Sequence, residues 1–70
     1  MPAYSFYVDG FSGIVSTLDE LKARICELKA RYPDLIGKDC QIMKGEAMRD
    51  GSGYYFPGDA SLRITRTITA

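Results

Sequence analysis

The chain has 70 residues, of which 46% are apolar, and nine basic and nine acidic side chains give it a formal net charge of zero. So short a chain builds one hydrophobic core, and we expect a single domain over residues 1–70. A zero net charge argues against general binding to nucleic acids or membrane surfaces, which favour a basic excess. No apolar run approaches the roughly 18 residues of a membrane span. The start of the chain lacks a secretory signal, so a cytoplasmic location is expected.

The reactive side chains of the sequence are few. There is no histidine, which excludes Ser-His and Cys-His nucleophile systems. Cys26 and Cys40 are the two cysteines, and in a cytoplasmic protein we expect both to be reduced. Two thiols are too few for a zinc site, so no metal is expected. The sequence therefore predicts a non-enzymatic protein without catalytic residues or a cofactor.

The first predicted element is a strand from Ala3 to Val8, because apolar and polar residues alternate there. Tyr4, Phe6 and Val8 would face the core. Residues 10–13 follow, and they lack the glycine spacing of a dinucleotide fingerprint and the lysine of a Walker loop. We interpret them as a flexible connection between the strand and a helix.

A helix is predicted over residues 17–32. Thr17 as the N-cap and Glu20 three residues later form a capping box, and Pro33 ends the helix. Apolar residues recur at spacings of three and four along one face, namely Leu18, Leu21, Ile25, Leu28 and Tyr32. We expect Leu21, Ile25 and Leu28 to be buried against a sheet.

Three further extended segments are predicted after the helix. A strand from Cys40 to about Met48 follows a loop in which Leu35 and Ile36 close the end of the core. Residues 50–53 form a strong turn signal, and residues 54–56 resume extended structure. The last strand, Leu62–Thr69, alternates between apolar and polar residues.

The predicted order of elements is β-α-β-β-β. This order indicates an α+β fold, a single two-layer domain with one amphipathic helix on a short antiparallel or mixed sheet. The helix would cover one face of the sheet, and the other would remain for solvent or a partner. On that outer face we expect Ser5, Tyr7, Tyr55, Arg63, Thr65 and Thr67.

The outer face and the terminal strand lead to the main functional hypothesis. Tyrosine and arginine are favoured anchors of protein interfaces. A terminal strand at or near an edge also offers unpaired backbone groups for strand addition. The expected interface comprises Tyr7, Tyr55, Arg63, Thr65, Arg66 and Thr67. We therefore expect a protein-binding module whose partner is another protein or a second copy, as in a homodimer. Small stoichiometric inhibitors of larger proteins or nucleoprotein complexes, encoded by phages and other mobile elements, share this size and charge.

A nucleic-acid-binding alternative uses the same aromatic residues. Tyr7 and Tyr55 beside Arg63 would form a platform on which bases stack. The zero net charge and the missing glycine-aromatic signature of the RNA-recognition module argue against this alternative.

An enzyme alternative depends on Pro2. The start of the chain, with a proline followed by a strand, a long helix and a strand, resembles the small tautomerase family from Pro2 to about Met43. The resemblance implies a catalytic base at the free amine of the N-terminal proline, arginines that bind a substrate carboxylate, and oligomeric subunits. This chain departs from that pattern because no arginine follows soon after the first strand.

Overall fold

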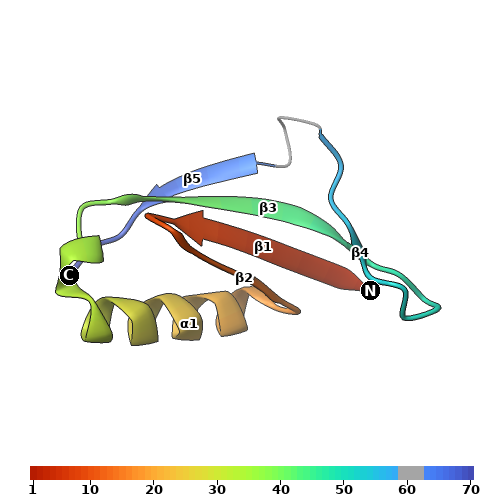
Figure 1. The fold of residues 1–70 in the computed structure, drawn as a ribbon, viewed down its shortest axis with the longest axis horizontal. Helices are drawn as coiled ribbons and strands as arrows, with labels where there is room; N and C mark the ends of the chain where they lie inside the picture. The colour runs from red at the N-terminus through yellow and green to blue at the C-terminus, as the bar shows by residue number, and fades with distance from the viewer. Residues whose placement is uncertain (59–62) are drawn as a thin grey trace.

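The computed structural model of the protein describes residues 1–58 and 63–70. One helix lies along one face of a curled antiparallel sheet, so the predicted two-layer α+β architecture is confirmed (Figure 1). The strands are β1 (Pro2–Val8), β2 (Phe11–Val15), β3 (Asp39–Ala47), β4 (Tyr54–Tyr55) and β5 (Arg63–Thr67). The helix α1 (Leu18–Arg31) precedes a short 3-10 turn, η1 (Pro33–Leu35).

The strand order is β2-β1-β3-β4, and β5 also pairs with β3. Every pairing is antiparallel. One edge of β3 carries β1, so β5 and β4 share its other edge. They lie one after the other, β5 against residues 39–43 and β4 against residues 46–47 (Figure 1). The terminal strand β5 is therefore at an edge of the sheet, and β1 and β3 are the central strands.

A strand occupies the segment that the sequence predicted to be a flexible connection. Asp9 and Gly10 both have positive φ, of 45° and 88°, which is the backbone of a two-residue hairpin turn. This turn sends the chain back along β1, and Val8 pairs with Phe11 at its base. The prediction for residues 10–13 is wrong because the turn falls at 9–10 and the following residues are extended. Gly13 interrupts the strand pattern in the sequence, since it has no side chain to alternate.

The helix begins and ends as its capping residues predict. The Glu20 amide donates to Thr17 Oγ1 over 3.1 Å, and the Glu20 carboxylate accepts from the Ser16 amide over 3.1 Å. The capping box is thus present in a modified form. The glutamate side chain accepts from the amide of Ser16 rather than from the amide of the N-cap residue Thr17, which is the usual donor. The Tyr32 amide closes the last turn on the Leu28 carbonyl, directly before Pro33.

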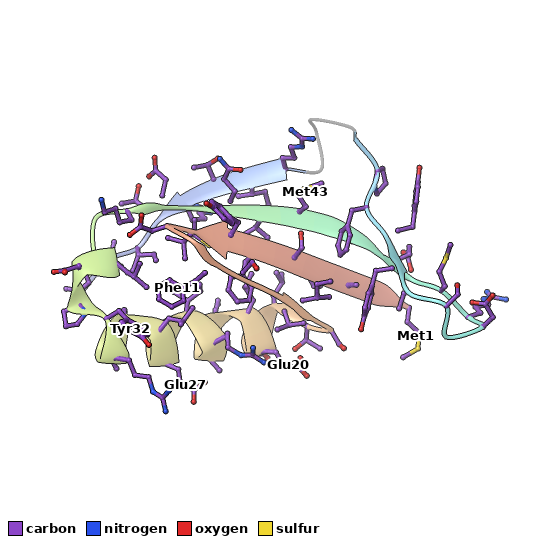
Figure 2. The ribbon with its side chains drawn as sticks, in the orientation of Figure 1. Met1, Phe11, Glu20, Glu27, Tyr32 and Met43 are labelled. Atoms are coloured by element: carbon purple, nitrogen blue, oxygen red, sulfur yellow. The ribbon has the colours of Figure 1, made fainter. Side chains whose placement is uncertain are left out.

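One cluster of buried side chains fills the space between helix and sheet. Its members are Phe6, Val8, Val15, Leu21, Leu35, Cys40 and Ile68. Leu35 is 2% exposed and closes the end of the core as predicted, whereas Ile36 is exposed. Phe11 and Tyr32 extend the contact between β2 and the end of α1, with ring centroids 4.7 Å apart (Figure 2).

The apolar stripe of the helix is buried less deeply than the sequence predicted. Leu21 is buried, but Ile25 and Leu28 are half-buried and Leu18 is 52% exposed. The reason is the position of the helix, which packs mainly on β1, β2 and η1. Glu20 and Glu27 lie on the helix face that points away from the sheet (Figure 2).

The second half of the chain follows the sequence prediction closely. The Ser52 amide donates to Asp50 Oδ1 over 2.9 Å within the predicted turn. The hydrogen bonds from Ser52 hold the pKa of the Asp50 carboxyl below its ordinary value. Residue Leu62, the predicted start of the last strand, lies outside the described residues. The pairing of this strand continues past its end, because the Ile68 amide donates to the Lys38 carbonyl over 2.9 Å.

Phe56 covers part of the outer face of the sheet. Its ring lies where a Cβ on Gly45 would stand, on the side of the sheet away from the helix. Ala3 pairs with Gly45 across the ladder and is 1% exposed. Ala3 is on the same face as Gly45, and the covering ring explains why it is buried.

Candidate functional site

Three strands bring four of the six predicted interface residues together on the outer face. Tyr7 is opposite Gln41, which is opposite Thr65, so these three side chains form one row across β1, β3 and β5. Ser5, Met43 and Arg63 form the next row. Met43 projects from the side of the sheet opposite the helix (Figure 2).

Thr67 continues this face at the end of β5. It is opposite Asp39, and its hydroxyl donates to Asp39 Oδ1 over 2.9 Å. Tyr7, Arg63, Thr65 and Thr67 therefore share one exposed face, as predicted.

The other two predicted residues are elsewhere. Tyr55 is opposite Glu46, whose neighbours along β3 put it on the face of the helix rather than the outer face. Arg66 is opposite the buried Cys40, so it also projects toward the helix side. The prediction that Tyr55 lies on the outer face is wrong, because a shift of one residue along a strand changes the face. The platform of Tyr7, Tyr55 and Arg63 is not formed either.

Pro2 occupies the first position of β1 and is exposed. Its ring nitrogen is part of the peptide bond to Met1, whose ammonium group lies 3.1 Å from Glu46 Oε2. The strand–helix–strand order that resembled the tautomerases is interrupted here by β2.

The free edge of β5 presents a defined set of backbone groups. The Ile68 amide donates to the carbonyl of Lys38 on the β3 side. Antiparallel pairing alternates along the strand, so the amides and carbonyls of Arg66 and Ile64 also point to β3. Those of Arg63, Thr65 and Thr67 point away from it. Within residues 1–58 and 63–70, β5 has β3 as its one strand partner.

A groove of about 680 Å³ lies between α1 and the helix-facing side of β5. We call it the α1–β5 groove. Ile42, Ile64 and Ile68 contribute from the sheet, and Leu18 and Ile25 contribute from the helix. The groove exists because the helix is displaced toward β1 and β2, which leaves Ile64 48% exposed.

The charged residues of this groove are mostly cationic. Lys22 and Lys29 line it from the helix, and Arg66 lines it from the strand. Lys29 Nζ also donates to the Thr69 carbonyl over 2.9 Å, which ties the helix to the end of the chain. Among the described residues that line the groove, Asp19 is the one acidic side chain.

Both cysteines are free thiols at this groove. Cys40 is buried at its base, where loss of hydration raises the pKa of the thiol above its ordinary value of 9.0. Cys26 is exposed on the helix wall. No cluster of three or more metal-ligating side chains occurs in the part of the chain that the structure describes. The single described helix is too short and too polar to cross a bilayer.

The chain matches no protein-family model, and no curated protein or solved structure is significantly similar to it.

The α1–β5 groove was not anticipated from the sequence, although its residues carried a signal. Ile64 and Arg66 alternate with Thr65 on the terminal strand, and Leu18 begins the helical stripe. Strand order decides that these residues meet, and strand order is not encoded in a local pattern.

Proposed function

We propose that this protein acts by binding another protein along the free edge of β5. The main support for this proposal is that the free edge lies beside the α1–β5 groove. Unpaired amides and carbonyls at a sheet edge bind an extended segment through main-chain hydrogen bonds, and pockets beside the edge select its side chains. Such binding needs no reaction, so a chain of this size would work stoichiometrically, as a small inhibitor of a larger protein does.

The edge at β5 is a better candidate than the edge at β2. Both strands have one partner among the described residues. β2 contains Gly13 and is followed directly by the helix, whereas β5 has no glycine and carries three β-branched residues (Ile64, Thr65 and Thr67) against two in β2. Long β-branched edges that remain uncovered are templates for strand addition.

The outer face adds a second set of contacts to the same edge. Tyr7 is 54% exposed and lies in the row that ends at Thr65. Tyrosine and arginine are common anchors at interfaces, so Tyr7 and Arg63 would contact a partner that extends over this face.

The test is a substitution that removes one edge donor and leaves the β3 ladder intact. Thr65→Pro deletes the amide that points away from β3, and proline is tolerated on an edge strand when its missing N–H faces solvent. Partners are first identified by cross-linking and mass spectrometry in the native host. Their affinities are then measured with purified proteins. We expect Thr65→Pro to weaken binding at least about tenfold, since a main-chain bond is lost and the ring blocks close approach.

Thr65→Val is the matched control, because it keeps the amide and the β-branched shape. Its affinity for the same partner should fall far less than that of Thr65→Pro, and the circular dichroism spectra of all three proteins should agree. A partner that binds Thr65→Pro as tightly as the unchanged chain would show that the interface lies elsewhere.

A further inference from the structure

We propose that the segment bound at β5 is an extended peptide with an acidic residue and an apolar residue two positions apart, both directed into the α1–β5 groove. This inference rests on the function proposed above and specifies the partner for that same edge. It follows from which backbone groups of β5 point away from β3 and from the charged side chains that line the groove.

The residues of β5 whose backbone groups point outward decide which peptide side chains enter the groove. A strand that adds antiparallel to β5 forms its hydrogen bonds with Thr65, so one peptide residue is directly opposite Thr65. That residue shares the outer face with the Thr65 side chain. Its two neighbours in the peptide are opposite Ile64 and Arg66 and project to the helix side, into the groove.

The two groove positions differ in chemistry. Ile64 is 48% exposed, and an apolar side chain at the position opposite it would cover part of that exposed surface. The position opposite Arg66 is in a groove that Lys22 and Lys29 also line. A carboxylate at this position would meet a cationic surrounding that Asp19 offsets only in part. The pattern of the peptide is therefore acidic, polar, apolar.

A second copy of this chain fits the edge less well. Residues 63–67 contain two arginines and no acidic residue. Antiparallel self-pairing centred on Thr65 would place Ile64 opposite the Arg66 of the other copy. The two Arg66 side chains would then be diagonal neighbours on one face, within about 8 Å of each other. Like charges in that position are repulsive, and both grooves would add their lysines, so we expect a different chain as the partner.

The experiment selects peptides without assuming a sequence. A displayed library of random peptides of about ten residues, the length of a long strand, is panned on the purified full chain. The binding of synthetic representatives is then measured by fluorescence anisotropy. We expect enrichment of the acidic–polar–apolar pattern. Thr65→Pro should abolish binding, whereas Thr65→Val, which keeps the amide, should lose far less affinity.

Charge reversal tests the register. Arg66→Glu should weaken the acidic peptides at least about tenfold, and a peptide whose acidic residue is replaced by lysine should regain affinity for this variant. Lys22→Glu on the exposed helix wall is a second variant with the same expected direction, in case Arg66→Glu lowers the stability of the fold. Amide spectra of each variant establish that the fold is retained.

The outcomes separate the two proposals. Peptides that bind Thr65→Pro and the unchanged chain equally would overturn both the edge and its partner. Peptides that need the Thr65 amide but are basic, or ignore Arg66→Glu and Lys22→Glu, would retain the edge and overturn the acidic partner. Failure to enrich any peptide would also overturn the inference. Dodecanoate, a fatty-acid anion, is the second probe, and if it binds in the groove while no peptide is selected, the ligand is an anionic amphiphile instead.

Discussion

At the scale of single residues, two glycines within strands have a packing role. Gly13 is opposite Phe6, and an added Cβ would stand 2.8 Å from the Phe6 ring. Gly45 is covered by the Phe56 ring and the Tyr55 carbonyl. A glycine interior to a strand weakens it locally, but it permits an aromatic ring to lie directly on the backbone. The Phe6 ring covers Gly13 on the helix side of the sheet, and the Phe56 ring covers Gly45 on the outer face.

We predict that Gly45→Ala destabilises the fold. The new methyl group would overlap the Phe56 ring and the Tyr55 carbonyl, and the second of these is backbone that cannot rotate away. Overpacking of this kind costs about 1–3 kcal/mol of unfolding free energy, measured by urea denaturation. Gly58→Ala is the matched control, because no atom of residues 1–58 and 63–70 is found within 4 Å of its Cβ position. It should be neutral or stabilising by up to about 1 kcal/mol. Equal stability of the two variants would contradict the placement of Phe56 over β3.

At the scale of elements, the limits of the helix depend on the local sequence, whereas the burial of its side chains depends on its position in the fold. The capping box and Pro33 predicted its limits, because the atoms involved are local in sequence. The depth of burial along its stripe was predicted less well. It depends on which strands the helix covers, and the period of the stripe contains no information on that.

We predict that two leucines of the same stripe respond differently to truncation. Leu21 is 4% exposed in the core, so Leu21→Ala should lower the unfolding free energy by about 2–5 kcal/mol. Leu18 is 52% exposed at the α1–β5 groove, so Leu18→Ala should cost less than about 1 kcal/mol. Both are measured by chemical denaturation. A larger loss for Leu18→Ala than for Leu21→Ala would mean that the helix lies closer to β5 than described.

The strands show the same division. β5 alternates clearly in sequence, and the structure has both β3 and β5, whereas β2 was taken for a connection. The turn that creates β2 consists of Asp9 and Gly10, a strong hairpin signal, but Gly13 hides the alternation that should follow it. The face of Tyr55 was predicted wrongly for a related reason. Period 2 is so short that a single residue of uncertainty in a boundary exchanges the two faces.

At the scale of the whole molecule, the candidate site is a consequence of strand order. β5 returns to pair with β3 instead of β2, so the sheet extends beyond the reach of its only described helix. The uncovered part of the helix side becomes the α1–β5 groove, and the end of the sheet becomes the free edge. The sequence predicted a terminal strand at or near an edge, but it did not predict the groove, which depends on contacts between residues far apart in the chain.

The last prediction concerns the pattern of amide hydrogen exchange over the sheet. β1 and β3 have strands on both sides, so their ladder amides should exchange most slowly, at rates set by global unfolding. Within β5 the rates should alternate. The amides of Ile64 and Arg66 donate toward β3 and should be protected, whereas the Thr65 amide points to the free edge and should exchange quickly. The measurement is two-dimensional NMR in deuterated water, at low and high protein concentration. Fast exchange at Thr65 at both concentrations would establish that the edge is open to a partner. Slow exchange at Thr65 that becomes faster on dilution would instead mean that a second copy covers β5, because only self-association responds to concentration in that way.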